Sequence, residues 1–383
     1  MIKCLKYRLF IIKKQQRLLQ EQLNECRWLY NHFLEQRKNS WEQDKKSIGY
    51  FDQCKSIVAL KKERPSLNNI YSQVLQNVAD RIDKSFQGFF SRVKARNGKV
   101  GYPRFKGFDR YDSLTYKQAG FGWSIENDSL KLSKIGSIKI KIHRAITGTL
   151  KTCTIRKQAN KWYGCFSIEY QNNPLPESKK AVGIDVGLSN FATFSTNEKI
   201  ENPRFFKIDQ KALAKSQRKL SKQTKGTPER KKVKKVVVRI HERISNRRHN
   251  FIHQESRKIV NEFGVICIEK LNVKGMMSEH NKVFGNKLNK SIADVAWGQF
   301  AQQLFFKAED AGRKIVAINP RGTSQRCSQC DSIVKKDLSV RWHDCPVCGC
   351  HLRRDHNASI NILSLGLQTL GLAPRSSRIY SGE

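Results

Sequence analysis

The sequence has no long hydrophobic run and no internal repeat. No stretch reaches the roughly 18 consecutive apolar residues that span a membrane, and no amphipathic segment has the pattern of a membrane-surface anchor. The opening MIKCLKYRLFIIKKQQ scatters charges among its apolar residues, so it lacks the apolar core of about 7–15 residues of a signal peptide. We therefore expect a cytoplasmic protein with no membrane partner.

Acidic residues are scarce in this chain. Asp and Glu total 33 against 73 Lys and Arg, which gives a formal net charge of +40. Such an excess requires a polyanion, and phosphate neutralisation supplies most of the non-specific affinity for nucleic acids. Nucleic acid is thus the predicted partner. The length of 383 residues allows two or three domains.

A disulfide framework is not expected, although the chain has 11 cysteines. Five of them cluster between Cys327 and Cys350. The other six are dispersed in apolar contexts, and in a reducing compartment such cysteines are small core residues. These six are Cys4, Cys26, Cys54, Cys153, Cys165 and Cys267.

The clustered cysteines form two Cys-x-x-Cys pairs, Cys327 with Cys330 and Cys345 with Cys348, 14 residues apart. That separation is just short of the ~15–20 residues of zinc ribbons. Each pair places two thiolates on one side of a tight turn, and two pairs complete a tetrahedral shell. The spacing predicts one structural Zn²⁺, because a closed shell leaves no position for water. A replacement ligand stays open among Cys350, His343 and His351.

Hydrophobic periodicity predicts an α/β fold class with additional all-β and helical parts. Residues 1–13 favour a first strand, and apolar residues then recur at helical spacing from Gln15 and again after Pro65. Beyond Gly98, short alternating strands separated by turns indicate a small antiparallel barrel over 100–172. Residues 172–176 form a predicted linker.

The part after the linker alternates apolar strands and helices. We expect strands at 180–188, 263–269 and 314–318, with a helix over 292–311. Between them, residues 207–248 contain sixteen Lys and Arg against three acids and read as helix interrupted at 226–228. Like charges at this density repel unless something neutralises them, so we expect nucleic-acid contacts here. The candidate residues are Arg239, Arg243, Arg247 and Arg248.

Three acids occupy unusual positions. Asp185 lies inside an apolar strand, where a charge is costly without a cation or partner, and the flanking Gly183 and Gly187 suggest close approach by a ligand or backbone. Glu269 closes the next strand, and Asp355 opens an apolar helix. Individually, Glu269 could be a surface charge and Asp355 an N-cap.

Together, the three carboxylates suit a site for two Mg²⁺ ions that hydrolyses phosphodiesters. The metal ions would also remove a contradiction, because an acidic pocket alone repels the phosphate backbone that the rest of the chain attracts.

The segments around these residues resemble a known family. GIDVGLSNFATFS, ICIEKLNV, TSQRCSQC, CPVCGC and RRDHNASINI are similar to the RuvC-like nuclease half of TnpB. GYPRFKG and RIHERISNRRHNFIHQ, further upstream, also resemble that family. TnpB proteins are compact RNA-guided nucleases of bacterial and archaeal insertion sequences, related to type V CRISPR effectors. The resemblance covers nearly the whole chain.

The resemblance implies a domain organisation. Residues 178–320 and 353–371 would form an RNase H-like (RuvC) nuclease domain, interrupted by a four-cysteine zinc ribbon at 321–352. Residues 1–13 and 100–175 would form a wedge-like β-barrel, with a helical recognition lobe inserted at 14–99. The Ser- and Arg-rich tail, 372–383, is expected to be poorly ordered.

The resemblance also implies an activity and partners. Asp185, Glu269 and Asp355 would be catalytic and hold Mg²⁺. A guide RNA from the transposon end would direct cleavage of double-stranded DNA beside a short flanking motif. The setting would be the nucleoid of a bacterium or archaeon, with a companion transposase in the same element. Base pairing would read the sequence, while the protein holds the heteroduplex by its backbone.

Two groups of residues are candidate nucleic-acid contacts. Tyr50, Gln73, Gln76 and Asn77 loosely resemble the region that reads the flanking motif, since Gln and Asn can pair bidentately with adenine. The alternative for the three amides is an ordinary polar helix face. Arg341 and Arg354 are candidate phosphate or transition-state contacts near the acids.

Three other functions remain open. A compact type V CRISPR effector would perform the same chemistry with a guide from a repeat array. A non-cleaving RNA-guided repressor would bind DNA only, which the three retained acids argue against. A transposase can also use an RNase H-like fold, but the cysteine-rich insertion ahead of the last acid resembles TnpB more closely.

Overall fold

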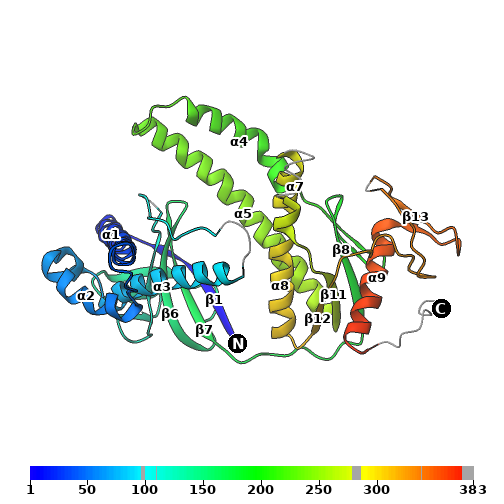
Figure 1. Ribbon diagram of the computed structural model, residues 1–383, viewed down its shortest axis with the longest axis horizontal. Helices are drawn as coiled ribbons and strands as arrows, with labels where there is room; N and C mark the ends of the chain where they lie inside the picture. Colours follow the sequence, from blue (N-terminus) through cyan, green and yellow to red (C-terminus); the bar gives the residue numbers. More distant parts are fainter. Residues whose placement is uncertain (96–99, 109, 278–285, 338, 373–383) are drawn as a thin grey trace. The chain divides into compact units, whose positions relative to one another are not determined.

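The computed structural model describes residues 1–95, 100–108, 110–277, 286–337 and 339–372. The chain divides into two compact units, Met1–Gln171 and Asn172–Glu383 (Figure 1). All but the first residue of the tail expected to be poorly ordered, 372–383, lies outside the described residues. None of the described helices is long and apolar enough to cross a membrane.

The first unit contains a seven-stranded antiparallel sheet in the order β2-β6-β7-β1-β5-β4-β3. The N-terminal strand β1 lies inside this sheet, between β7 and β5. Within the described residues β2 and β3 remain unpaired edges, so the sheet is a half-barrel and not a closed barrel. The strands are β1 Ile2–Phe10, β2 Ser113–Tyr116, β3 Trp123–Glu126, β4 Ser129–Leu132, β5 Gly136–Lys141, β6 Thr149–Gln158 and β7 Lys161–Glu169.

Three helices and a 3-10 turn complete the first unit: α1 Lys13–Asp44, α2 Tyr50–Glu63, η1 Pro65–Asn69 and α3 Ser72–Lys94. The apolar stripes read from the sequence are buried, including Leu23 and Phe33 on α1 and Ile82 on α3. The guanidinium of Arg81 on α3 donates to the carbonyl oxygen of Ser113 at 3.1 Å, which fastens this helix to the edge strand β2.

The second unit has a mixed five-stranded sheet in the order β10-β9-β8-β11-β12. β8, β9 and β10 are antiparallel neighbours, whereas β11 runs parallel to both β8 and β12. The sequence did not predict β9 and β10. The strands are β8 Ala181–Val186, β9 Asn190–Phe194, β10 Lys199–Glu201, β11 Val265–Glu269 and β12 Lys314–Ile318.

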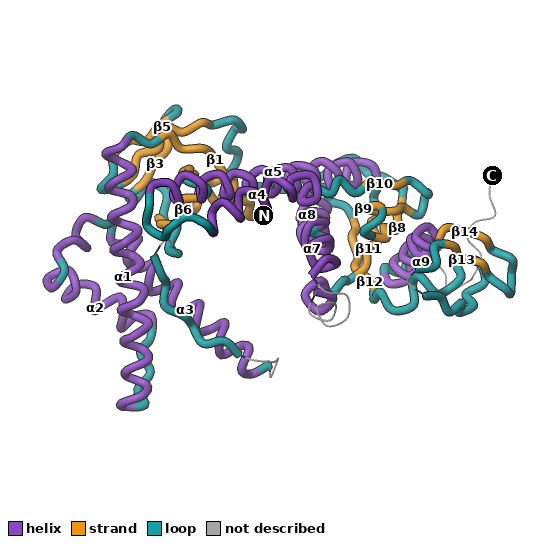
Figure 2. Tube along the Cα trace, turned by 90° about the horizontal axis from the view of Figure 1, so that it is seen from above, coloured by secondary structure: helices purple, strands orange, loops and turns teal. Residues whose placement is uncertain are grey.

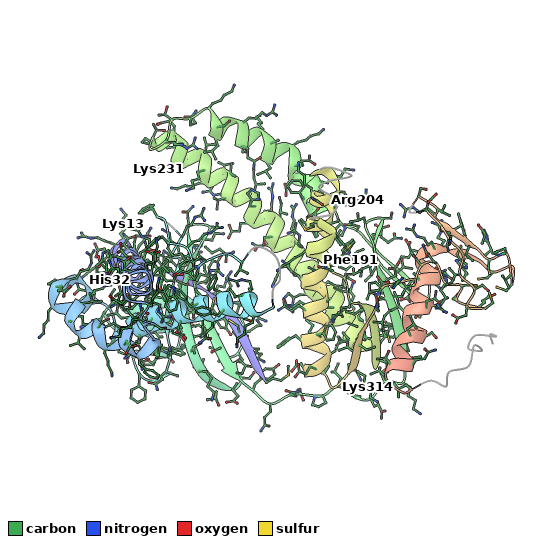
Figure 3. The ribbon with its side chains drawn as sticks, in the orientation of Figure 1. Lys13, His32, Phe191, Arg204, Lys231 and Lys314 are labelled. Atoms are coloured by element: carbon green, nitrogen blue, oxygen red, sulfur yellow. The ribbon has the colours of Figure 1, made fainter. Side chains whose placement is uncertain are left out.

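Helices lie on both faces of this sheet. α5 (Pro228–Glu262) and α8 (Trp297–Asp310) cover one face, on the side where Phe191 lies (Figure 3). The ring of Phe191 packs edge-to-face on those of Phe251 and Phe300. α9 (Arg354–Thr369) covers the other face (Figure 2). The helix predicted over 292–311 is in fact two helices, because Ala296 adopts a left-handed conformation between α7 (Asn286–Val295) and α8.

The basic segment forms a helical hairpin, α4 (Phe205–Ser221) followed by α5, with the turn at the predicted break (Figure 1). Thr227 caps α5 by accepting a hydrogen bond from the backbone of Arg230, and Pro228 takes the first helical position. A small apolar core holds the two helices together, formed by Leu213, Val237, Ile240 and Ile244. Lys231 lies near the outer end of this hairpin (Figure 3).

Candidate functional site

Asp185 and Glu269 end neighbouring parallel strands. Ile184 of β8 is in register with Ile268 of β11, so the residues that follow them lie at the same level. Side chains alternate along a strand. Because Ile184 and Ile268 enter the core beneath α5 and α8, the two carboxylates point to the opposite face of the sheet. That is the face covered by α9.

α9 approaches this face closely because two glycines have no side chain in the space between the helix and the sheet. A Cβ atom on Gly183 would lie 2.1 Å from the carbonyl oxygen of Ser359, and one on Gly366 would lie 2.2 Å from the sulfur of Cys267. Neither contact is compatible with a side chain. The sequence prediction that Gly183 marks a close approach is confirmed, and the approaching group is the backbone of α9.

This packing brings Asp355 to the other two acids. Asp355 lies one turn before Ser359, hence on the same face of α9. From there, the charge of Asp355 raises the pKa of Asp185. The alternative that Asp355 caps the helix is wrong, because the capping position belongs to Arg353 and Asp355 is already in the first turn.

The three carboxylates repel one another. Burial raises the pKa of Asp185 well above its usual value, and the charges of Glu269 and Asp355 raise it further, while Arg354 opposes the shift. Burial also raises the pKa of Glu269, against the effect of a hydrogen bond from Thr323. Such a cluster of partly buried carboxylates is more stable when it binds cations.

Two further side chains hold the acids in place. The hydroxyl of Thr323 donates to Oε1 of Glu269 at 2.6 Å. Nε of Arg354 lies 3.4 Å from Oδ1 of Asp355, and its Nη1 donates to the carbonyl oxygen of Val340 at 3.0 Å. Thr323 was missed in the sequence; its signal was a hydroxyl shortly after β12, at the carboxyl end of the parallel strands.

Two buried asparagines join α9 to the cysteine-rich insertion. The amide of Asn357 donates to the carbonyl oxygen of Arg326 at 2.8 Å and accepts from the backbone of Ser328 at 2.9 Å. Asn361, one turn later, donates to the carbonyl oxygens of Thr323 and Arg326 at 2.8 and 2.7 Å. The same helix therefore positions an acid and the start of the insertion. Sequence reasoning missed both residues, although their i, i+4 spacing was visible.

The structure brings the four predicted cysteines together. The sulfur of Cys327 lies 3.6 Å from that of Cys348, and Cys330 lies 3.5 Å from Cys345. All four sulfurs lie within 4.8 Å of one another, and no other group of three or more such ligands in the described residues is as close. A tetrahedral zinc with Zn–S bonds of about 2.3 Å needs sulfurs roughly 3.8 Å apart. The geometry fits that metal.

None of the three alternative ligands joins this group. Cys350 is buried beside the cluster but outside it. Nδ1 of His343 contacts the amine of Lys336, and Nδ1 of His351 pairs with Asp344. Two short strands, β13 (Trp342–Asp344) and β14 (His351–Arg353), carry the two histidines.

In the first unit, Tyr50 and Gln73 both contact the segment of Lys117 and Gln118. The ring of Tyr50 lies 5.7 Å from the amine of Lys117, and the amide of Gln73 donates to Gln118 at 2.6 Å. Gln76 is exposed on α3. These three residues stay predicted DNA contacts.

Asn77 has a different role. It is only 7% exposed, donates to Asp80 at 3.3 Å and accepts from Nε of Arg81 at 2.9 Å. The structure therefore argues against a base contact by Asn77. Its amide positions the guanidinium that fastens α3 to β2.

Three of the four arginines of α5 that were predicted to contact nucleic acid form ion pairs with acids of this same chain. Arg243 and Arg247 contact Asp209, and Arg248 contacts Asp294. These pairs fix α4 and α7 against α5, and the side chains of Arg243 and Arg247 stay close to half exposed.

Arg239 and Arg341 are both exposed. The carbonyl oxygen of Arg341 accepts a hydrogen bond from the backbone of Arg354 at 2.9 Å, so Arg341 lies beside the start of α9. Both arginines stay predicted phosphate contacts.

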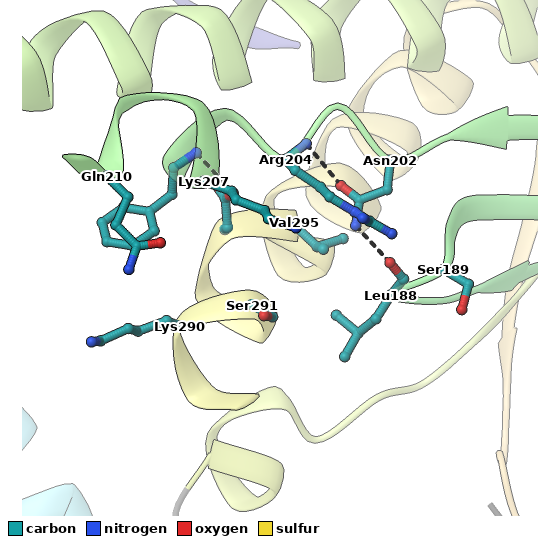
Figure 4. Close-up of a pocket in the computed structure, with 11 residues that line it drawn as sticks. Leu188, Ser189, Asn202, Arg204, Lys207, Gln210, Lys290, Ser291 and Val295 are labelled. Atoms are coloured by element: carbon teal, nitrogen blue, oxygen red, sulfur yellow. Dashed lines mark hydrogen bonds between the residues drawn. The ribbon is translucent and has the colours of Figure 1, made fainter. Parts of the chain in front are cut away.

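A cationic pocket of about 580 Å³ lies between the start of α4, the turn after β8, and α7 (Figure 4). Arg204, Lys207 and Lys290 line it. Asp294, the one acid among its described lining residues, already accepts hydrogen bonds from the first turn of α4 and from Arg248. The pocket therefore keeps an excess of positive charge.

Three family profiles match the chain. Residues 165–279 match OrfB_IS605, described as "Probable transposase", and residues 297–362 match "Cas12f1-like, TNB domain". Residues 1–46 match a profile described as "Helix-turn-helix domain". In this structure those residues form a strand and one long helix, β1 and α1.

Relatives and solved structures agree with these matches. A "Putative RNA-guided DNA endonuclease" of Streptomyces pristinaespiralis is 32% identical over 94% of this chain and 89% of its own length. InsQ of Escherichia coli, described in the same words, is 29% identical over 89% and 86%. The fold resembles that of Cas12f1 bound to guide RNA and target DNA, with a TM-score of 0.58 at 13% identity, over 92% of this chain and 83% of that one. The resemblance found in the sequence is confirmed: the chain belongs to the TnpB (OrfB_IS605) family.

Proposed function

We propose that the chain is an RNA-guided DNA endonuclease, which binds a guide RNA from its transposon end and hydrolyses target DNA beside a short flanking motif. One observation carries the proposal. Asp185, Glu269 and Asp355 come from distant parts of the chain and converge on one face of the mixed sheet. The relatives named RNA-guided DNA endonucleases support the same activity.

The second unit is proposed to be an RNase H-like nuclease domain of the RuvC type. Its support is the sheet order β10-β9-β8-β11-β12, with three antiparallel strands followed by two parallel ones. α9 then returns over the central strands and carries the last acid. The four-cysteine segment enters between β12 and α9, as the proposed zinc ribbon at 321–352.

Asp185, Glu269 and Asp355 are proposed to hold two Mg²⁺ ions. Carboxylate oxygens are the ligands that Mg²⁺ prefers. The charges of Glu269 and Asp355 raise the pKa of Asp185, and two ions about 3.5–4 Å apart would offset this repulsion across all three carboxylates. When bound, such a pair of ions activates a water molecule and stabilises the leaving oxygen of the phosphodiester.

The protein's own residues set the geometry of this reaction. Thr323 orients one oxygen of Glu269 and leaves the other available. Arg354 holds Asp355 and keeps a positive charge beside the carboxylates, where the scissile phosphate would lie. The α4–α5 hairpin and the pocket around Lys207 supply cations for the phosphate backbone of the bound strands.

The four cysteines are proposed to hold one structural Zn²⁺. The sulfur spacing fits the metal, and the apolar side chains of Val334 and Leu352 pack against the cluster. A stretch of chain with so small an apolar core needs the metal to fold.

The test begins with protein purified from cells that carry its native locus. Sequencing of the co-purified RNA should identify one guide-like species; RNA no more enriched than in a mock purification would end the RNA-guided part of the proposal. With that RNA, Mg²⁺ and a plasmid target, the wild type should cut and Asp185→Asn should not, while both bind target DNA equally. Glu198→Gln, an exposed acid in the β9–β10 turn, is the matched control and should cut normally.

A transposase is the second candidate, because the profile over residues 165–279 is described in those words. A transposase joins donor DNA ends to a target, whereas a hydrolytic nuclease leaves free ends. The same reaction therefore distinguishes them: strand-transfer products, detected by sequencing of joined ends, would favour this candidate over the endonuclease.

A further inference from the structure

Two cavities adjoin in the first unit and share Tyr102 as a common wall. The first, which we call the aromatic cavity, has a volume of about 280 Å³ and lies between the end of α1 and the second half of α3. Its five aromatic walls are Trp41, Phe86, Phe89, Phe90 and Tyr102. The volume is just below the range of roughly 300–1,000 Å³ for small-molecule sites, so one flat ring system fits better than a large ligand.

The second cavity, which we call the basic cavity, has a volume of about 410 Å³. Among the residues that the structure describes, five cationic residues line it and no acid does: Lys84, Arg92, Arg104, Lys106 and Arg110. One of these charges is already paired, because Lys84 contacts Asp80 at 3.1 Å. The remaining cations face a space that suits phosphate groups.

The shared wall is rigid. The ring of Tyr102 meets the rings of Phe86 and Phe89 edge-on, with centroids 5.5 and 5.3 Å apart. The amide of Asn31 on α1 donates to the carbonyl oxygen of Lys106 at 3.1 Å and accepts from its backbone N–H at 2.8 Å. The segment that separates the cavities is thus anchored to α1, and a ligand would find the site already formed.

The aromatic cavity is open to solvent at its rim and neutral at its floor. Trp41 is 56% exposed and Phe90 is 55% exposed. The buried guanidinium of Arg37 stacks on Phe86 at 5.1 Å, but its charge is satisfied by Asp83 at 3.2 Å. Lys46 also lines the cavity, so it offers flat π-faces together with one cation that can contact a phosphate or the polar edge of a base.

We propose that the two cavities together bind one unpaired nucleotide of the guide RNA, with its base in the aromatic cavity and its flanking phosphates in the basic cavity. Bases splayed out of a single strand stack on aromatic side chains, and cations beside them hold the backbone. A neutral apolar partner would leave the basic cavity unused. This inference rests on the proposed function, since it assigns a protein site to the guide.

RNA is a better occupant than DNA because a guide RNA stays bound to the protein for longer. Exposed aromatic surface of this kind is unfavourable in water. A guide RNA stays bound between encounters with targets and covers that surface continuously, whereas a displaced DNA strand is present only at a target.

The test measures the binding of labelled single strands of about 12 nucleotides, within the site sizes of ~4–16 nucleotides known for single-strand binders. The probes are oligo(rA), its abasic ribose-phosphate analogue and oligo(dA), followed by fluorescence anisotropy without added Mg²⁺. Trp41→Leu with Phe90→Leu should weaken binding of oligo(rA) by about five- to hundredfold, the usual range for the loss of base stacking. The same variant should bind the abasic probe as the wild type does.

The cations should behave differently. Arg92→Gln with Arg104→Gln should weaken both RNA probes and reduce the slope of log affinity against log salt by about 0.7 for each lost phosphate contact. Two matched controls lie elsewhere in the unit, Phe121→Leu at an exposed aromatic and Lys139→Gln at an exposed cation of β5. Both should leave the base-dependent difference between the probes unchanged.

Three results would overturn the inference: equal loss on base-containing and abasic probes, an equal effect of Phe121→Leu, or an aromatic effect confined to oligo(dA). Trp41→Phe keeps a stacking face and should restore most of the affinity lost with Trp41→Leu, which separates stacking from misfolding. None of these measurements requires cleavage. A failed nuclease assay and a failed nucleotide site are therefore distinguishable.

Discussion

A methyl group at Gly183 tests whether α9 sets the catalytic geometry. In Gly183→Ala the new Cβ would lie 2.1 Å from the carbonyl oxygen of Ser359 and 2.8 Å from Cβ of Leu363. The first contact involves backbone, so it cannot be relieved by rotation of a side chain. α9 has to move away from β8 by roughly 1 Å, the size of misplacement that costs about a hundredfold in rate at an active site.

The same contact has a cost in stability. Overpacking of this kind destabilises proteins by about 1–3 kcal/mol, which corresponds to about 2–4 °C in Tm for each kcal/mol in a domain of about 150–250 residues. We therefore expect Gly183→Ala to lower the Tm of the second unit by several degrees and to lower the DNA cleavage rate about a hundredfold. Binding of the guide RNA should be unchanged.

The matched control is Gly298→Ala, since a Cβ there meets no atom within 4 Å. Gly298 lies inside α8, where alanine is favoured over glycine by about 0.5–1 kcal/mol. This variant should cut normally and unfold at the same or a higher temperature. If Gly183→Ala cuts and unfolds like the wild type, the reasoning about α9 is wrong. If it loses stability but its folded fraction cuts at full rate, Asp355 is not positioned by this contact.

Three further predictions concern the second unit. Cys345→Ser should lose zinc, measured by mass spectrometry against about one atom per wild-type chain, and hydrogen exchange should rise in 321–352 while the first unit is unaffected. Burial lowers the pKa of Lys307 to about 8, so the unfolded chain binds more protons between about pH 8 and 10.5, and stability should rise with pH across that window. Lys307→Met should remove up to about 3 kcal/mol of this rise, and denaturation curves that differ equally at every pH would contradict the pKa shift. Asn361→Ala removes two hydrogen bonds to the loop before Cys327 and should cost about 1–3 kcal/mol, whereas Thr369→Ala at the exposed end of α9 should be nearly neutral in the same melts.

The sequence predicted those parts of the site that carry a local signal. Asp185 could be found because a charge inside an apolar strand is costly, and the cysteines because their spacing is specific. Gly183 was read correctly as a point of close approach. Only the structure shows that the approaching backbone belongs to Ser359, 176 positions away in the chain.

Long-range pairing and backbone conformation account for what the sequence could not predict. Arg243 looked like a free cation because its partner, Asp209, lies in another helix. The break between α7 and α8 falls at Ala296, a residue type that normally continues helices, so no local signal marked it. Asn77 looked like part of a polar helix face until Arg81 was seen to use it.

The two proposed metal sites depend on one helix. Its N-terminal turn carries Asp355, while Asn357 and Asn361 hold the loop that leads to Cys327. That same loop contains Thr323, which orients Glu269. Loss of zinc should therefore reach the carboxylates through a short path of hydrogen bonds. A zinc-free protein should lose cleavage beyond what its loss of DNA affinity explains, and saturating target DNA should not restore the rate.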